Sequence, residues 1–481
     1  MEIESTTCEK GLMSRLCDWA KALFGKIRTK MGNVVNRIMK LAIDDPRRVI
    51  HSFKVALALT FVSLIYYIRP LYDGFGVTGI WAVLTVVVVF EFTVGGTLSK
   101  GINRGIATFC AGGLALAANY IAIHLGKEGE PVFLGCLLFL LAAVSTFVRF
   151  FPHIKRRYDY GVLIFILTFS MVAISGYRVE KIIELANQRL FTIIVGGATC
   201  MVVSLFLCPV WAGEDLHKLI ALNMEKLASF LEEFGGEYFK LHEEESTRDV
   251  DICSKDKLLF LHGYKSVLNS KASEESLANF AWWEPGHGRF KFSHPWKLYL
   301  KTGVLIRQCA YHIEALNGYL NTDIQVQSEF HKTIAEPCMK MSSESGKALK
   351  ELASSLRDMK RPSTSSTHIK NCEAAISDLR AALEASSPGR ADILKIIPSI
   401  AVGSLLIDIT KCVGKISESI HELSDKASFE STESTLSSHI IIHRGSTVKP
   451  LISDTTHGND DNRVHVVIIN TTPSATCPRL V

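Results

Sequence analysis

The sequence lacks the residue patterns that identify most enzymes and metalloproteins. Its 12 cysteines are scattered, and no two of them form a CxxC or CxxxC pair. This spacing argues against a zinc framework and against a secreted disulfide scaffold, so we expect reduced thiols. The sequence also has no nucleophile–base constellation and no HxxxH spacing within an apolar run. We therefore predict no catalytic residue, no metal site and no cofactor.

Other absences narrow the choice of partner and of fold class. The net charge is only +5, and no basic run with interleaved aromatics suggests a nucleic-acid partner. The first fifty residues contain ten Lys or Arg and lack the apolar core of a signal peptide. No strand-like alternation is persuasive before residue 438. We predict an all-α fold and no binding of nucleic acid.

The chain of 481 residues divides by composition into two unlike halves with flanking segments. Uncharged apolar runs fill the first half, and mixed charged sequence with helical periodicity fills the second. A helical pattern covers about 254–280, and an amphipathic helix is predicted directly after the last apolar run. The apolar residues that recur at helical spacing in that helix are Leu216, Ile220, Met224, Leu227, Leu231 and Phe234. The predicted domains are a basic cytosolic N-terminal segment (1–50), a transmembrane domain (51–211), a cytosolic helical domain (212–426) and a polar, disordered C-terminal tail (427–481).

Six apolar runs are candidate membrane spans, since about 20 residues of helix cross the hydrocarbon of a bilayer. Their approximate cores are 53–68, 75–90, 105–125, 131–148, 160–177 and 190–211. Buried helices of a large soluble protein are the alternative, which six runs with such short connectors disfavour. A later apolar run, 396–407, is short and broken by Pro398, so we expect a buried helix there. The predicted fold is an all-α membrane protein with six transmembrane helices per subunit and a cytosolic helical bundle.

The distribution of Lys and Arg orients these spans. The N-terminal segment and the connectors 91–104 and 149–159 together carry sixteen, and the three connectors on the other side carry five. Cytoplasmic loops are enriched in Lys and Arg. Both termini are therefore predicted to be cytosolic.

Two basic clusters stand at the inner ends of neighbouring spans. A helix beginning near Leu98 would place Lys100 and Arg104 one turn apart on one face, with Arg104 entering the third span. The second cluster leads into the fifth span and contains Arg149, Lys155, Arg156 and Arg157.

Three interpretations of these cations remain open from the residues alone. They could line an anion pathway, because rings of Arg or Lys select anions in pores. They could be topology signals and nothing more. They could also pair with Glu91 and Asp159, which would leave no net positive field.

The sequence resembles the plant aluminium-activated malate transporters, a family of anion channels. The resemblance lies in "DDPRRVIHSFKVALALTFVSL", "PLYDGFGVTGIWAVLTVVVVFEF", "GGTLSKGINRG", "RRYDYGVLIFILTF", "PVWAGEDLHKL" and "WWEPGHGRF". These segments occur in the family's order over roughly residues 44–290.

The resemblance implies a homodimer in a lipid bilayer that passes malate and other small anions passively and without catalysis. It implies that Arg104 and Arg157 line the pore. Arg156 is a further pore candidate at a position that varies in the family, and Lys100 would lie at the cytoplasmic mouth. An ion-coupled organic-anion secondary transporter is the alternative, but we find no inverted repeat and no acid at the centre of a span.

The resemblance also marks Trp283, Glu284 and Pro285 of "WWEPGHGRF" as the family's Trp-Glu-Pro motif. Physically, Pro285 should end the preceding helix, Trp283 can anchor a turn, and Glu284 can pair with a basic side chain. We expect a gating or structural role rather than contact with the anion, because a carboxylate repels malate.

Regulation and location are less determined by the sequence. "KRPSTSSTHIK" at 360–370 is predicted to be a flexible connector open to a regulatory kinase. Aluminium would need hard oxygen ligands on the outer face, and no spacing defines such a site. The acids available there are Asp73, Glu128, Glu130, Glu180 and Glu184. "LCPVWAGEDLHKL" resembles the family segment linked to inhibition by gamma-aminobutyrate, but Cys208 stands where some relatives have a larger residue, which puts such inhibition in doubt. The short C-terminal region favours the plasma membrane over the vacuolar membrane.

Overall fold

A computed structural model describes residues 4–68, 79–176, 182–239, 263–320, 329–363, 365–385 and 393–430. These residues are nearly all helical and contain no strand beyond two isolated bridges, His287 with Phe290 and Lys360 with Glu430. The helices of the first half are α1 Glu4–Asp44, α2 Pro46–Tyr67, α4 Ile80–Val89, α5 Val94–His124, α6 Gly126–Val148, α7 Pro152–Arg157, α8 Asp159–Gly176 and α9 Ile182–Phe206. Those of the second half are α10 Ala212–Phe239, α12 Lys265–Leu268, α13 Lys271–Ala281, α14 Trp296–Leu320, α15 Glu329–Asp358, α16 Ser365–Ala385 and α17 Ile393–Ala427.

Among all the described residues, four helices are long and apolar enough to cross a membrane. They are Val94–His124, Glu128–Val148, Asn187–Phe206 and Ile396–Ala427, and shorter apolar helices cover Ile80–Val89 and Asp159–Ser175. Each of the six predicted runs contains a helix, although α2 does not meet the same criterion. We refer to α2–α9 as the apolar half.

The start of α5 corrects the predicted 91–104 connector. The helix begins at Val94, where the Thr93 side chain accepts a hydrogen bond from the backbone N–H of Gly96 at 3.1 Å. This is a regular helix N-cap. The connector is therefore much shorter than we predicted, and Lys100 and Arg104 both lie inside the helix.

Large apolar side chains face outward from the apolar half. Phe109, Phe139 and Phe206 are 68%, 77% and 81% exposed. Contiguous apolar surface of this kind is unfavourable in water and favourable against lipid. Inside, small residues of α5 pack on α8, which lets the two backbones approach closely. The α5 residues of this contact are Ala111, Ala115, Ala118 and Ala122, facing Phe169, Val172 and Ala173.

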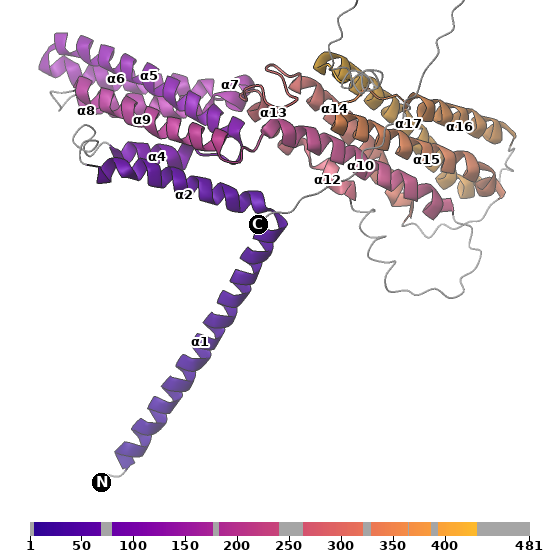
Figure 1. Ribbon diagram of the computed structural model, residues 1–481, viewed down its shortest axis with the longest axis horizontal. Helices are drawn as coiled ribbons and strands as arrows, with labels where there is room; N and C mark the ends of the chain where they lie inside the picture. Colours follow the sequence, from indigo (N-terminus) through magenta and orange to yellow (C-terminus); the bar gives the residue numbers. More distant parts are fainter. Residues whose placement is uncertain are drawn as a thin grey trace, which may run out of the picture. The chain divides into compact units, whose positions relative to one another are not determined.

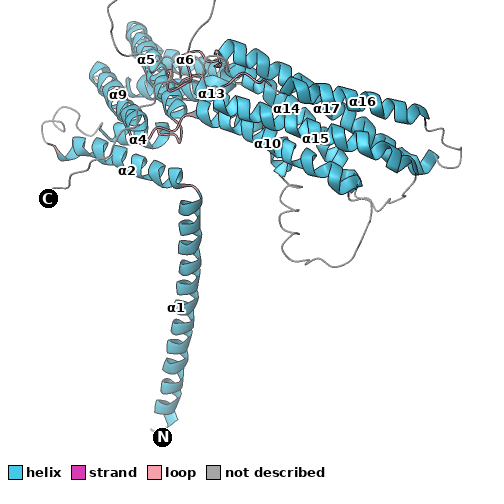
Figure 2. Cartoon of the chain, turned by 45° about the vertical axis from the view of Figure 1, so that its right-hand side comes forward, coloured by secondary structure: helices cyan, strands magenta, loops and turns pink. Residues whose placement is uncertain are grey.

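The second half is a helical bundle built around α10, α14, α15 and α17, with α16 against α15 (Figures 1 and 2). The predicted amphipathic face of α10 is confirmed, because its periodic apolar side chains are fully buried. They are Leu216, Ile220, Met224, Leu227, Leu231 and Phe234. We refer to α10–α17 as the bundle.

Two helix predictions in the bundle need correction. One helix was expected over 254–280, but the chain forms α12 and α13, separated by a turn at Asn269. Residues 254–262 lie outside the described part. The predicted flexible connector 360–370 is too long, because α16 begins at Ser365, whose side chain is buried.

Helix α17 contains the apolar run 396–407 that we expected to be a buried helix. Val402 and Leu406 belong to the same core as α10 and α15, while Ile397 and Ile400 are exposed. By length and composition this helix resembles a span, yet one of its faces forms part of the bundle core. The predicted tail lies outside the described residues beyond residue 430.

Candidate functional site

Arg104 is a buried cation on α5. Its side chain is 4% exposed, and its Nη1 donates a hydrogen bond to the Tyr160 hydroxyl at 3.2 Å. Its Nε is buried without a hydrogen-bond partner. Among the described residues, no carboxylate lies within ion-pair distance of its guanidinium. A buried charge without a partner is costly, so this position is unusual.

Arg157 ends the short helix α7 and is half-buried. Its Cζ lies 4.2 Å from the centroid of a Trp282 ring, a close cation–π distance. Its Nε is also buried without a partner, and burial together with Arg156 lowers the pKa of its guanidinium. As far as the chain is described, no carboxylate pairs with it either.

A hydrogen bond holds the two arginine-bearing segments side by side. The side-chain amide of Asn103, which precedes Arg104, donates to the backbone carbonyl of Arg157 at 3.0 Å. Gly161 lies directly against Asn103, since a Cβ there would come within 3.3 Å of its amide oxygen. Helix α5 and the junction of α7 with α8 therefore meet at this point, as the two clusters in the sequence suggested.

Lys100 and Arg149 behave differently, because each has an acidic partner. Lys100 forms an ion pair with Glu91, and the Arg149 Nε lies 2.7 Å from Asp159 Oδ1. The pairing interpretation therefore holds for these two cations. It fails for Arg104 and Arg157.

Arg156 is exposed, and only its backbone takes part in a contact between helices. Its carbonyl accepts a hydrogen bond from the Asn279 amide of α13 at 2.7 Å. This bond ties α7 to the bundle. The structure therefore connects the predicted pore segment to the second half directly.

Glu284 has a different environment from the one we predicted. Its partners are three backbone N–H groups rather than a basic side chain. They belong to Ala212 (2.6 Å), Gly213 (3.0 Å) and Gly95 (3.3 Å). The carboxylate is 5% exposed, and burial raises its pKa, while these three donors act in the opposite direction.

The three N–H groups lie at the beginnings of two helices, α5 and α10. Helix N-termini present unpaired N–H groups and the positive end of the helix dipole, which favour a carboxylate. Glu284 thus caps the helix that carries Arg104 and the first helix of the bundle at once. This is a structural contact between the two halves, and it supports a coupling role for the motif.

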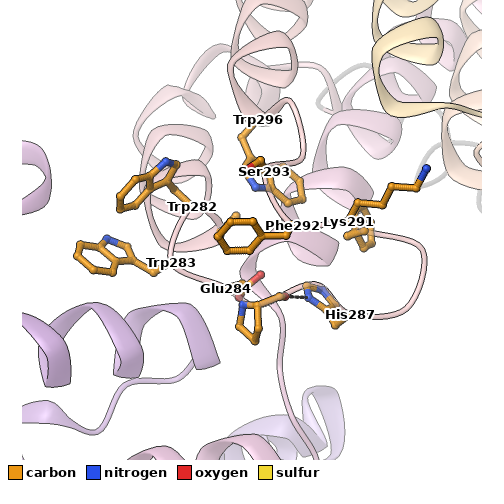
Figure 3. Close-up of a pocket in the computed structure, with 11 residues that line it drawn as sticks. Trp282, Trp283, Glu284, His287, Lys291, Phe292, Ser293 and Trp296 are labelled. Carbon is orange, nitrogen blue, oxygen red and sulfur yellow. Dashed lines mark hydrogen bonds between the residues drawn. The ribbon is translucent and has the colours of Figure 1, made fainter.

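The rest of the motif surrounds this carboxylate (Figure 3). Helix α13 ends at Ala281, shortly before Pro285, as expected. Trp283 packs edge-on against Tyr158 with ring centroids 6.2 Å apart. A cavity of about 330 Å³ lies alongside, and its lining includes Trp282, Glu284, His287, Phe292 and Trp296.

Several residues at this site were not assigned a role from the sequence. Trp282 and Tyr160 lie in segments that carry the family resemblance, but those segments did not indicate that each side chain would contact an arginine. Asn103 also lies in such a segment and Asn279 lies outside them all, but the sequence indicated neither contact, because side-chain hydrogen bonds to distant carbonyls depend on the tertiary fold.

The regulatory predictions receive little support from the geometry. The side chains of Glu128 and Glu130 are the only described ones among the five outer acids, and no described group of His, Cys, Asp or Glu could hold a metal ion. Cys208 adopts a positive φ of 40°, and its carbonyl accepts a hydrogen bond from Lys54 Nζ at 2.8 Å.

Similarity to known proteins covers most of the chain. The sequence model of the family described as aluminium activated malate transporter matches residues 39–390. The chain is 48% identical over 440 residues to aluminum-activated malate transporter 2 of Arabidopsis thaliana, covering 92% of this chain and 85% of that protein. It is 43% identical over 423 residues to aluminum-activated malate transporter 1 of Triticum aestivum, covering 86% and 90% respectively.

Proposed function

The chain belongs to the aluminium-activated malate transporter family, and from this premise we propose that it is a plant anion channel. It would pass malate and small inorganic anions passively through a pore lined by Arg104 and Arg157. The family is one of membrane transporters, which confirms the prediction that the chain is not an enzyme.

The observation that carries this proposal is the absence of described carboxylate partners at Arg104 and Arg157. Malate is a dianion at neutral pH, and moving it through hydrocarbon without compensation is prohibitive. A guanidinium keeps its charge and can bind a carboxylate through two parallel hydrogen bonds. The anion would therefore supply the partner that the protein leaves out.

Conduction also requires release. An arginine already paired with an acid would attract the permeating anion only weakly, and a dense cluster of unpaired arginines would trap it. In the proposed homodimer each arginine occurs twice, which gives about four cations along the path. Lys100, paired with Glu91, would shape the field at the cytoplasmic mouth, and Arg156 would add an exposed charge beside it.

We further propose six spans per subunit, with both termini and the bundle in the cytosol and the protein in the plasma membrane. Glu284 would couple the bundle to the pore helix, because one carboxylate holds the first turns of α5 and α10. A kinase that acts on the bundle could shift this coupling. We expect no direct contact between the Trp-Glu-Pro motif and the anion.

The test is patch-clamp recording in a heterologous cell with malate, chloride, nitrate and sulfate exchanged in turn. A channel gives reversal potentials that follow the anion gradient alone. Dependence on a proton or sodium gradient would instead indicate the ion-coupled secondary transporter.

Variants test the pore residues. Arg104→Ala and Arg157→Ala should each reduce malate current about tenfold or more with unchanged surface expression, and Arg104→Glu should be worse. The exposed Arg156→Ala should have a smaller effect. Unchanged current density and selectivity in both single variants would refute the assignment of the pore arginines.

A further inference from the structure

The N-terminal helix α1 has an apolar face that nothing in the described chain covers. It is one continuous helix, Glu4–Asp44 (Figures 1 and 2). Every side chain from residue 23 to residue 41 is exposed. Among them Phe24, Met31 and Ile38 are 75%, 60% and 61% exposed. Exposed apolar side chains in such number mark a surface that has a partner.

Most of these side chains form a single broad face, and only Met39 and Ile43 lie outside it. Apolar residues recur at intervals of three and four, which is helical spacing. They are Phe24, Ile27, Met31, Val34, Ile38 and Leu41, joined by Trp19, Leu23 and Val35. At 3.6 residues per turn the whole set occupies an arc of about 160°. A two-stranded coiled coil buries a narrower stripe.

The charges on this helix are of one sign. Between residues 19 and 43 there are six Lys or Arg and no Asp or Glu. Five of the six lie at the edges of the apolar face when the helix is viewed down its axis. Lys21 and Arg28 lie at one edge, and Lys26, Lys30 and Arg37 lie at the other. Long basic side chains at these positions can bury their stems in an apolar layer and reach its polar surface with their charges.

The chain connects this helix directly to the apolar half. Helix α1 ends at Asp44, and α2 begins at Pro46 after a single residue, Asp45. Asp45 accepts a hydrogen bond from the Arg47 backbone N–H at 3.2 Å and so caps α2. The C-terminal end of α1 is therefore at the start of the first proposed span, which in the proposed topology is the cytosolic surface of the membrane.

We propose that α1 lies on the cytosolic leaflet, with its apolar face in the boundary between headgroups and acyl chains and its cations on anionic lipid headgroups. Amphipathic helices with a basic polar face bind membranes in this way. Anionic lipids give the cytosolic leaflet a negative charge, which attracts the cations of α1. The inference goes beyond anion conduction and rests only on the proposed orientation of the N-terminus.

A second copy of α1 is a poorer occupant of this face. Pairing two copies would bring twelve positive charges together, with no acid between residues 19 and 43 to form an interhelical ion pair. Like charges across such an interface cost stability. The breadth of the apolar arc would also leave much of it uncovered.

The test uses the full-length protein in phosphatidylcholine nanodiscs with and without phosphatidylserine. Backbone hydrogen exchange is measured for residues 19–43. We expect exchange to slow roughly tenfold or more when phosphatidylserine is present, since each cation near an anionic surface strengthens binding severalfold. Substituting Ile27→Asp with Val34→Asp should abolish the slowing. Asn36→Asp, in the middle of the opposite face, is the control and should keep most of the slowing of exchange.

A second readout separates lipid from protein contact and does not depend on the aspartate variants. A fluorescent amino acid is placed at Met31 or at Asn36, and quenching by nitroxide-labelled lipid is compared. We expect quenching at Met31 alone, weakened when Lys21, Arg28, Lys30 and Arg37 are changed together to Gln. Slow exchange without quenching in both lipid compositions would indicate a second copy and overturn the proposal. Fast exchange in both would also overturn it, as would slowing that appears only when an acidic protein such as calmodulin is added. Currents do not enter either readout, so the result is independent of the proposed channel activity.

Discussion

Buried basic side chains differ between the bundle and the apolar half in whether they have an acidic partner or are neutral. In the bundle, Arg307 is 9% exposed and forms an ion pair with the fully buried Glu274. Burial lowers the pKa of His217 and of His294 to about 4, so both are neutral at physiological pH. In the apolar half, Arg104 is only 4% exposed, yet a tyrosine hydroxyl is its described partner.

This difference sets Arg104 apart from the paired Arg307. A buried cation is tolerated when it is paired or when it gives up its proton. A guanidinium does not give up its proton, and Arg104 and Arg157 have no described acid. Such a position is expected where an external anion completes the pair, and perturbed or unpaired charges cluster at functional sites.

The largest effect expected from this contrast is on the stability of the bundle. Arg307→Ala leaves the Glu274 carboxylate buried without its cation, which costs about 3–5 kcal/mol. Thermal unfolding of the purified full-length protein measures the loss. Lys301→Ala, which removes an exposed partner of Glu422, is the control and should change little. Equal melting temperatures for the two variants would show that the buried pair does not stabilise the bundle.

The contact between the two halves should come next in size. Glu284→Ala removes both acceptor oxygens from the first turns of two helices, and a loss of about 2–3 kcal/mol is expected. Glu284→Gln keeps one acceptor oxygen and should lose less. The same unfolding assay compares them, and current per channel at the surface reports coupling. If Glu284→Ala unfolds like the wild type, the double cap does not hold the halves together.

The neutral histidines predict acid sensitivity of the bundle. The folded-state pKa of His217 is below its ordinary value near 6.5, so the folded state binds fewer protons than the unfolded state. The associated stability is present above pH 6.5 and is lost as the pH falls toward 4. At pH 5 the loss from His217 is about 2 kcal/mol.

Thermal unfolding between pH 7 and pH 5 checks this sign. The His217→Gln variant should show a flatter dependence than the wild type. A wild-type melting temperature that is constant over this range would contradict the assignment of a neutral buried histidine.

The smallest effect is expected at the paired lysine of the apolar half. Lys100 and Glu91 are each about one third exposed, so their ion pair contributes less than about 1 kcal/mol. Lys100→Gln combined with Glu91→Gln removes both charges and should leave malate current within about twofold of the wild type. A loss as large as that of Arg104→Ala would remove the distinction between paired and unpaired cations.

Much of this arrangement could be predicted from the helical spacing of apolar residues and from the order of the apolar runs along the chain. Helical spacing identified the buried face of α10, and the apolar runs located the helices of the first half. The two inner basic clusters indicated that α5 and the chain around Arg157 would lie near one another, because both precede neighbouring spans. Pairing was left open between several acids and cations, since sequence distance does not decide which carboxylate a flexible side chain reaches.

Other features could not be predicted because they depend on contacts between distant segments. Glu284 was expected to meet a basic side chain, but three backbone N–H groups from two helix starts provide a stronger and more fixed environment. The start of α5 at Val94 follows from the Thr93 cap, whose hydrogen bond depends on the local backbone geometry and shortens the connector predicted at 91–104. The contact between the Trp282 ring and Arg157 joins two segments that are far apart in the sequence.

We propose that the buried Arg104, which has no described acid partner, lies on the anion path and that the paired Arg149 does not. The most direct test is the reversal potential in a malate gradient for Arg104→Gln against Arg149→Gln. Both variants remove one positive charge from the same end of the apolar half, but Arg149 is paired with Asp159. We predict that the reversal potential of Arg104→Gln moves away from the malate equilibrium potential while that of Arg149→Gln stays at the wild-type value. Equal shifts in both variants, or no shift in either, would contradict the account.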